Sequence, residues 1–344
     1  MNKKLKIGFV GNLFGTPKGH SYVANNMVNA IMDAGHETHM YRLNNNAISD
    51  EFRKPTSLKS NTSMIISKED FEAWLDEIKP DYCVFNEYAQ WWSEDHDKLE
   101  ICKDRGIKTV GYLVWEKLDW NKKDHYKLYT TIIAPTGFQT KLFRKHGLYN
   151  AVHVPWGTDI DEIDAVEIPK RNKDDRVRFY HCAGSGGIGD RKNTQTIIDA
   201  FELIKDESVE LMITHLGSKI FSRNEIIAFM KQSDVLVNTS RWDTIGLNTL
   251  EANACGIPVI VADTEPMNEL VIDNTNGIVV PGDETTCDAV TCPVFNVDVD
   301  ALSQKMSIFK NKTILNMLKR NSRAFAEVNF NWKLNKENFI KVFK

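Results

Sequence analysis

The sequence predicts an α/β protein built from two parallel-sheet domains, and three observations support this prediction. Short apolar runs alternate with amphipathic stretches of helical period, which is the pattern of strand–helix–strand units in parallel sheets. The pattern stops at a charged, proline-containing stretch over residues 159–175, which is interpreted as a linker, and then restarts. The length of 344 residues also favours two domains.

The first half of the chain is expected to form one sheet with its helices. Strand-like apolar runs are Lys6–Gly11, Thr38–Tyr41, Tyr82–Phe85, Thr109–Val114, Thr131–Ala134 and Ala151–Val154. Amphipathic stretches predict helices at Ser21–Ala34, Lys68–Glu77 and Thr136–His146. The Thr136 hydroxyl is expected to cap the last of these helices. Residues 43–66 are polar and irregular, which predicts a surface excursion.

The second half repeats the alternation of strand and helix. Strands are expected at Val177–Ala183, Val209–Thr214, Val235–Asn238 and Val259–Ala262. Helices are expected at Asn193–Leu203 and Glu225–Lys231, and at the C-terminal stretch Phe330–Phe343. The sequence contains no internal repeat that would indicate a solenoid or propeller.

Composition and charge exclude several classes of protein. With 42% hydrophobic and 26% charged residues, the chain has the composition of a soluble globular protein. A net charge of −4 gives no overall attraction to nucleic acid or to anionic membranes. No apolar run is long enough to span a bilayer, and Asn12 and Gly15 interrupt the N-terminal run that imitates a signal peptide.

Six scattered cysteines indicate reduced thiols and a cytoplasmic location. A pairing of Cys287 with Cys292 across a loop stays open. Neither the cysteine spacing nor a nearby histidine cluster suggests a zinc site.

The most informative stretch covers residues 240–262. It places two acids, Asp243 and Glu251, eight positions apart around the start of an apolar helix. Gly246 and Leu247 fall in the first turn, where unpaired N–H groups and the positive dipole end favour an anion. Glu251 lies roughly 6–8 Å further along the axis at 1.5 Å per residue. The spacing predicts a nucleoside diphosphate whose ribose hydroxyls are bound by Glu251.

This stretch resembles the Glu-x7-Glu signature of the retaining GT-B glycosyltransferases of family 4. Asp243 takes the place of the first Glu of the signature. The positions that match it are Gly246, Leu247, Leu250, Glu251, Ala252, Ala254, Gly256 and Pro258. The resemblance implies two Rossmann-like parallel-sheet domains that face a cleft. These are an acceptor-side domain at 1–160, a nucleotide-sugar-binding domain at 161–329, and a helix at 330–344 that crosses back and packs on the first domain.

Other parts of the chain extend and limit the resemblance. Gly35-His36-Glu37 and the stretch 154–159 resemble further passages of the family, so the resemblance covers nearly the whole chain. One βα unit of the relatives is missing between Leu211–His215 and the helix Glu225–Lys231. In relatives this unit forms part of the nucleobase pocket, so the resemblance does not extend to that pocket.

The loop that follows the first strand of the second domain contains the pattern Gly-x-Gly-x-x-Gly from Gly184, which imitates a dinucleotide fingerprint. The next strand ends at His215 without the acid that would hold an adenosine ribose, which argues against nicotinamide chemistry. By resemblance, Gly184 and Ser185 adjoin the pyrophosphate, Ser185 replaces an Arg, and Lys192 matches a phosphate-binding Lys. Arg191 is placed to compensate for the replaced Arg.

Breaking a sugar–phosphate bond leaves a nucleoside diphosphate whose negative charge grows in the transition state. Preplaced cations and N–H groups stabilise such charge and are expected to replace a metal here. The expected donor-side groups are Lys192, Arg191 and the helix start at Ile245, Gly246, Leu247 and Asn248. Asp243 is expected to contact hydroxyls of the transferred sugar. The triplets Asp159–Asp161 and Asp298–Asp300 are interpreted as linker and helix-start residues, not as metal ligands.

The acceptor side is assigned by resemblance and by position. Gly19 matches the family's glycine beside the donor phosphates, and His20 follows it. Glu87 and Glu116 each follow a predicted strand, and the carboxyl ends of strands face the crevice in such folds. Glu116 is included among the candidate catalytic residues. Trp115 or Glu116 stands where relatives often carry a His. Gly19, Glu87 and Glu116 are equally consistent with a turn or surface role, whereas a structural role is favoured for His20.

Residues 115–129 interleave four aromatic residues with four lysines. Aromatic rings stack on sugars and bases, and lysines bind phosphates. The stretch is therefore either an acceptor platform or a loop that covers the domain.

The sequence thus predicts a metal-independent, retaining hexosyl- or pentosyltransferase that uses a nucleotide diphosphate sugar, with a UDP-sugar favoured, and no further cofactor. The acceptor stays open among a glycan, a lipid-linked group and a protein. DNA with hydroxylated bases is disfavoured by the net charge. The alternative is a non-catalytic nucleotide- or glycan-binding protein of the same fold, which Ser185 and the missing βα unit favour.

Overall fold

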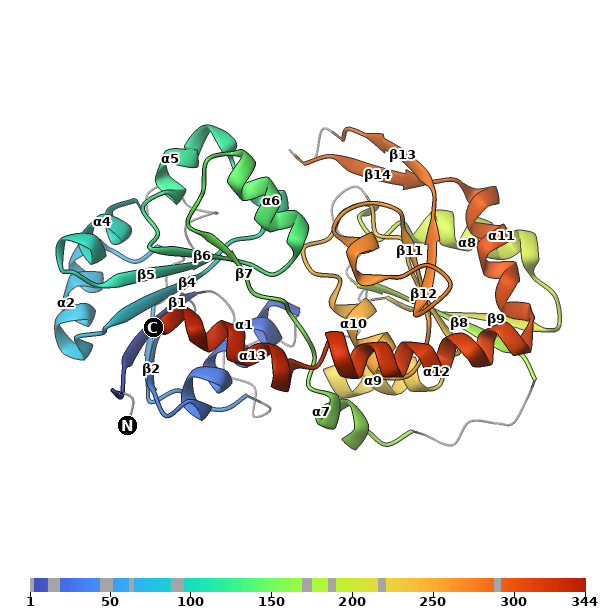
Figure 1. Cartoon of the computed structure of the whole chain (residues 1–344), viewed down its shortest axis with the longest axis horizontal. Helices are drawn as coiled ribbons and strands as arrows, with labels where there is room; N and C mark the ends of the chain where they lie inside the picture. Colours follow the sequence, from blue (N-terminus) through green and yellow to red (C-terminus); the bar gives the residue numbers. More distant parts are fainter. Residues whose placement is uncertain are drawn as a thin grey trace. The chain divides into compact units, whose positions relative to one another are not determined.

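The protein is described from a computed structural model. The described residues are 3–11, 19–43, 52–61, 65–87, 96–168, 175–184, 190–215, 221–287 and 292–344. The chain divides into two compact units: Met1–Pro155 with Asn335–Lys344, and Trp156–Leu334. Each unit is built on a parallel sheet with helices packed against it (Figure 1).

The first unit contains a seven-stranded sheet in which every neighbouring pair of strands is parallel. The strand order is β3-β2-β1-β4-β5-β6-β7. The strands are β1 (Lys6–Gly11), β2 (Glu37–Arg42), β3 (Ser57–Ser60), β4 (Tyr82–Asn86), β5 (Lys108–Tyr112), β6 (Thr131–Ala134) and β7 (Ala151–His153). The order reverses between β1 and β4, so the carboxyl ends of these two strands form a topological switch point.

Six of these strands confirm the prediction, and β3 corrects it. The sequence predicts an irregular stretch over residues 43–66, but residues 57–60 pair with β2. β3 is an edge strand with mostly exposed side chains, so it lacks the apolar signal that reveals a buried strand.

The helices of the first unit are α1 (Gly19–Asp33), α2 (Lys68–Ile78), α4 (His96–Asp104), α5 (Lys123–Tyr126) and α6 (Gly137–Lys145), with short 3-10 turns at Trp115–Lys117 and Trp120–Lys122. The predicted cap is confirmed, because Thr136 Oγ1 accepts the N–H of Gln139 at 3.1 Å. The C-terminal residues also belong to this unit. Phe343 packs edge-on against Tyr82 with 5.3 Å between ring centroids.

The second unit contains a parallel sheet with the order β12-β11-β10-β8-β9 and a separate antiparallel pair. The strands are β8 (Val177–Gly184), β9 (Val209–His215), β10 (Val235–Asn238), β11 (Val259–Ala262), β12 (Gly277–Val280), β13 (Gly282–Thr285) and β14 (Val294–Val297). The helices are α7 (Ile160–Ala165), α8 (Thr194–Ile204), α9 (Arg223–Lys231), α10 (Leu247–Ala254), α11 (Val299–Ser307), α12 (Lys312–Asn329) and α13 (Trp332–Ile340), the last of which continues into the first unit.

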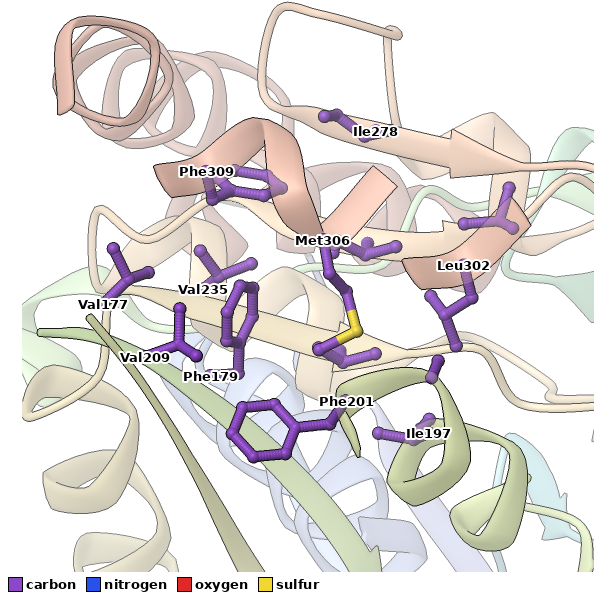
Figure 2. Close-up of a cluster of buried hydrophobic side chains, with 14 of the residues drawn as sticks. Val177, Phe179, Ile197, Phe201, Val209, Val235, Ile278, Leu302, Met306 and Phe309 are labelled. Atoms are coloured by element: carbon purple, nitrogen blue, oxygen red, sulfur yellow. The ribbon is translucent and has the colours of Figure 1, made fainter. Parts of the chain in front are cut away.

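The hydrophobic core of the second unit joins its parallel sheet to the helices α8 and α11. Figure 2 shows Phe179 of β8 between Val235 of β10 and side chains of α8 and α11, including Phe201 and Met306. These side chains are buried, and burial of one such side chain contributes roughly 1.5–3 kcal/mol. The sheet therefore gives the residues beyond its strand ends a rigid base.

The stretch interpreted as an interdomain linker contains the helix α7. Asp159 caps it, with Oδ1 accepting the N–H groups of Asp161 and Glu162. Asp298 caps α11 in the same way through the N–H of Ala301. Both Asp-x-Asp triplets therefore mark helix starts.

Between β9 and β10 the described chain forms only the helix α9. All six cysteines fall within the described ranges, and each is a free thiol, so Cys287 and Cys292 do not pair. In these ranges no helix is long and apolar enough to cross a membrane.

Candidate functional site

The charged residues of the Asp-x7-Glu segment lie beyond the carboxyl ends of β8 and β10. In the order β12-β11-β10-β8-β9, these two strands are neighbours at the point where the chain changes direction across the sheet. Ligands of open parallel sheets bind at this kind of switch point. The segment from Ser240 to α10 follows β10, and Lys192 lies between β8 and α8.

Asp243, Lys192 and Arg191 form one group of ion pairs, here named the Asp243 cluster. The Asp243 Oδ2 atom accepts from Lys192 Nζ at 2.9 Å and from Arg191 Nη1 at 3.1 Å. Its Oδ1 atom accepts the N–H groups of Thr244 at 2.9 Å and Gly246 at 3.2 Å. The structure thus brings together three side chains that the sequence assigns to one site.

The Asp243 cluster carries one net positive charge, because two cations share one carboxylate. Burial alone would raise the pKa of Asp243, but Lys192 and Arg191 hold it well below its usual range. The carboxylate is therefore ionised throughout the neutral range.

Neighbouring polar groups fix the Lys192 ammonium in place. Lys192 Nζ also donates to Ser240 Oγ at 3.2 Å. The Ser240 hydroxyl in turn donates to Asn238 Oδ1 at 2.7 Å, and the Asn238 amide donates to Thr249 Oγ1 at 3.1 Å. This buried chain connects the end of β10 with α10, and the sequence reasoning did not identify it.

Gly246 is the N-cap of α10 and has a left-handed backbone with φ +67°. An added Cβ would lie 2.8 Å from Leu270 Cδ1 and 3.0 Å from Met267 Cε. Both the backbone angle and the lack of space therefore require glycine. The Gly246 N–H donates to Asp243 Oδ1. One of the N–H groups that were expected to bind an anion therefore already has a partner within the chain.

The remaining residues of the predicted helix start and of the β8 loop lie as follows. Ile245 is buried, while Leu247 and Asn248 lie in the first turn of α10. Gly184 ends β8 with φ +61°, and no atom of the described residues lies within 4 Å of the place that a Cβ would take. Ser185 lies outside the described residues.

Glu251 belongs to a second group of ion pairs, here named the Arg223 cluster. Arg223 Nε donates to Glu251 Oε1 at 3.0 Å, Nη1 donates to Glu162 Oε2 at 2.7 Å, and Nη2 donates to Thr158 Oγ1 at 2.8 Å. Two carboxylates share one guanidinium, so the cluster carries one net negative charge. Burial alone would lower the pKa of Arg223, but Glu251 and Glu162 raise it above its ordinary value.

Glu251 influences two other buried groups. Burial and then the Glu251 charge raise the pKa of the Cys255 thiol to about 12. Tyr180 of β8 has a raised pKa because it is buried; its hydrogen bond with Thr214 opposes this shift, and the Glu251 charge adds to it.

Sequence reasoning missed Arg223, Glu162 and Thr158. A capping box formed by Ser222 and Glu225 marks the start of α9 and places Arg223 at its first residue. That motif was a usable signal for the helix start, but no spacing rule connects Arg223 to Glu251, which is 28 residues away.

In the first unit, the predicted acceptor-side residues follow the strands as expected from their order in the chain. Glu87 comes directly after β4, adopts φ +57°, and lies 3.8 Å from the Lys117 ammonium. Glu116 belongs to the 3-10 turn after β5, and Gly19 and His20 begin α1, the first helix after β1. Because β1, β4 and β5 are neighbours in the sheet, these residues follow three adjacent strands.

The aromatic rings of residues 115–129 mainly pack into the first unit. Trp115 is 6% exposed and lies edge-on against Phe138, with 5.1 Å between centroids. Tyr126 and Tyr129 are also buried, while Trp120 stacks on His146. Most of the rings in this stretch therefore pack into the fold of the first unit.

Comparisons with known sequences find similarity between parts of this chain and glycosyltransferases. Residues 213–286, which include α9, α10 and the Arg223–Glu251 pair, match the family described as Glycosyl transferases group 1. An uncharacterized glycosyltransferase from Methanocaldococcus jannaschii is 23% identical over 73% of this chain and 64% of its own length. A GDP-mannose-dependent mannosyltransferase acting on phosphatidylinositol dimannoside, from Mycobacterium tuberculosis, is 25% identical over 42% of this chain and 43% of its own length. The chain thus spans less than two thirds of the length of either relative.

Solved structures match nearly the whole chain in fold. A glycosyltransferase from Rickettsia africae has a TM-score of 0.76 at 13% identity, covering 99% of this chain and 98% of its own. The Anabaena protein HepE, solved in complex with UDP-glucose, has a TM-score of 0.73 at 14% identity, covering 98% and 99%. The predicted fold class, two Rossmann-like parallel-sheet domains of the GT-B type, is confirmed.

Proposed function

We propose that the protein is a retaining glycosyltransferase that binds a nucleotide diphosphate sugar on its second unit. The observation that carries this proposal is the Asp243 cluster, where two cations meet one carboxylate at the switch point of the sheet. One net positive charge beside the start of α10 suits a diphosphate. The match of residues 213–286 to Glycosyl transferases group 1 supports the same assignment.

The two oxygens of Asp243 suggest how a donor enters the site. Backbone N–H groups hold Oδ1, while Oδ2 holds both cations. A diphosphate that forms ion pairs with Lys192 and Arg191 frees the Oδ2 atom of Asp243, while the Oδ1 atom stays bound to the backbone. The freed oxygen then accepts hydroxyls of the transferred sugar, and Glu251 accepts those of the ribose.

The proposed chemistry needs positive charge at the leaving group. As the sugar–phosphate bond breaks, negative charge moves to the diphosphate, and Lys192 and Arg191 stabilise it without rearrangement. The acceptor hydroxyl attacks the anomeric carbon on the face that the leaving group departs from, and its proton passes to the departing phosphate. These cations supply the charge that a metal ion supplies in other transferases, so we propose a metal-independent reaction.

Among donors, a UDP-sugar is favoured. HepE was solved with UDP-glucose, and the Staphylococcus aureus protein TarM was solved with UDP. The mycobacterial relative is GDP-mannose-dependent. A GDP-sugar is therefore the first alternative donor to compare with a UDP-sugar.

For the acceptor we propose a glycan, lipid-linked or protein hydroxyl bound by the first unit, with Gly19, His20, Glu87, Trp115 and Glu116 as the positions to examine. Hydroxylated DNA remains the less favoured acceptor because the net charge is −4. The proposal thus divides the chain into an acceptor side at residues 1–160, to which the C-terminal helix at 330–344 is added, and a donor side at residues 161–329.

The proposal is tested by the donor KM of Glu251→Ala. Loss of a hydrogen bond to a charged group is expected to raise the KM for UDP-sugar by about 10–100-fold. A KM equal to that of the wild type contradicts the assignment of Glu251. Melting temperatures with UDP, GDP, ADP and their sugar conjugates identify the donor.

A non-catalytic nucleotide or glycan binder of the same fold is the second candidate. It is favoured by the fact that Asp243 and Glu251 both form ion pairs within the chain. Release of UDP from a UDP-sugar distinguishes the two, because a binder releases none.

A further inference from the structure

We propose that Arg223 is a positioning residue that orients Glu251 toward the ribose of the donor. This inference rests on the proposed function, because it concerns the same nucleotide site. It assigns a role in nucleotide recognition to a side chain that is 28 residues away in sequence and that the signature does not include.

The Arg223 guanidinium is held from three directions. Its nitrogens donate to Glu251 on α10, to Glu162 on α7 and to the Thr158 hydroxyl. Its side chain is only 12% exposed. The planar group therefore has one orientation that satisfies all three partners, and a lysine cannot reproduce it.

The Thr158 anchor is itself fixed by the backbone. The Thr158 N–H donates to the Phe330 carbonyl at 2.8 Å, and the Thr158 carbonyl accepts from the Trp332 N–H at 3.0 Å. Thr158 is 2% exposed. Arg223 therefore connects Glu251, through two hydrogen bonds, to a residue whose backbone is held in place.

Arg223 contacts Glu251 through Nε, which donates to Oε1. A two-point pair would occupy both carboxylate oxygens, but here Nη1 and Nη2 donate to Glu162 and Thr158. Oε1 is therefore the anchored atom, and the proposal places the ribose hydroxyl on Oε2.

The charge balance of the Arg223 cluster suits hydroxyl donors. Glu251 and Glu162 together exceed the charge of Arg223 by one, so Glu251 keeps negative character toward a ligand. A ribose hydroxyl donates well to such an oxygen. Without Arg223, Glu251 loses the contact that fixes its orientation.

The chain offers a matched control in Arg323. Its Nη1 and Nη2 bind Asp164 of α7, and Nη1 also donates to the Ala254 carbonyl at the end of α10. Arg323 therefore links the same two helices as Arg223, but it pairs with Asp164 in place of Glu251. Its replacement perturbs the same packing without touching the proposed ribose site.

The test is the ratio of the dissociation constants of UDP and 2′,3′-dideoxy-UDP, measured by calorimetry. The wild type is expected to prefer UDP by about 10–100-fold. In Arg223→Met this preference should fall at least about fivefold, with the affinity for the dideoxy compound changed by less than about twofold, because only the hydroxyl contacts depend on Glu251. Arg323→Met should lower the melting temperature and keep the wild-type ratio.

If Arg223→Met does not fold, Arg223→Lys is the second test variant. It keeps the positive charge beside Glu251 but cannot donate to all three partners of the guanidinium. Its preference for UDP should also fall. A wild-type ratio in either folded Arg223 variant overturns the inference. If the wild type binds UDP but Glu251→Ala keeps the ratio, or if the wild type binds no nucleotide, the proposed donor site itself is wrong.

Discussion

The Asp243 cluster and the Arg223 cluster lie at the two ends of residues 243–251, and they combine charges in opposite proportions. In the Asp243 cluster two cations share one carboxylate, whereas in the Arg223 cluster two carboxylates share one cation. The first suits an anion and the second suits hydroxyl donors. In the proposed function, this difference matches the order of the groups in a nucleotide, from diphosphate to ribose, along a helix that rises about 1.5 Å per residue.

The largest expected effect comes from removing a cation of the Asp243 cluster. Lys192→Met should lower kcat/KM for the sugar nucleotide by about 10²–10³-fold, because a preplaced donor to the growing charge is lost. Initial rates at varied donor concentration measure it. Lys205→Met, which removes the partner of Glu202 at the end of α8, is the control and should keep wild-type rates. Equal rates in Lys192→Met and the wild type contradict the role of the cluster.

Asp243→Asn sharpens the comparison because it removes the carboxylate and keeps both cations. It should lower the free energy of unfolding by about 3 kcal/mol at pH 7, since a largely buried ion pair loses one partner. It should also bind UDP about tenfold more tightly, because the competing charge is gone. Sugar transfer should fall nonetheless. Urea unfolding and calorimetry measure the two effects, and weaker UDP binding would show that Asp243 does not compete with the diphosphate.

The stability difference between the wild type and Asp243→Asn should depend on pH. The pKa of Asp243 is lowered in the folded protein, so its contribution is complete above the unfolded pKa of about 3.9. It is lost as the pH falls below that value toward the folded pKa. Urea midpoints between pH 7 and pH 3 should therefore converge in acid. A difference that grows on acidification would mean that the Asp243 pKa is raised instead.

The smallest effect is expected for Glu162→Gln in the Arg223 cluster. The Glu162 side chain is 54% exposed, so its pair with Arg223 is screened by solvent. The free energy of unfolding should change by less than about 1 kcal/mol. Glu251 keeps its bond to Arg223 Nε, so the preference for UDP over its dideoxy analogue should fall only slightly. A loss as large as in Arg223→Met would show that the outer carboxylate is also required.

Most of the fold was predictable from the sequence because buried strands carry a strong apolar signal. β1, β6, β10 and β11 have the predicted bounds, and Thr136 caps α6 as expected. The edge strand β3 was missed because its exposed side chains resemble those of a loop. The helix α7 was missed because it has only six residues within a charged stretch.

The candidate site was predictable only where residues are close in sequence or follow a motif. Asp243 and Glu251 flank one helix start, and Lys192 was assigned to them by resemblance. The pairing of Asp243 with both cations was not predicted, because Lys192 is 51 residues away and their contact depends on the strand order. Arg223 was missed for the same reason, since α9 and α10 become neighbours only in the folded unit.

The central claim is that the Asp243 cluster binds the diphosphate and Glu251 binds the ribose of one nucleotide. A crystal structure of the protein with UDP tests it most directly. We expect phosphate oxygens about 2.7–3.2 Å from Lys192 Nζ and from the Arg191 guanidinium, with a ribose hydroxyl at the same range from Glu251 Oε2. UDP bound elsewhere, with Asp243 still holding both cations, would contradict the claim.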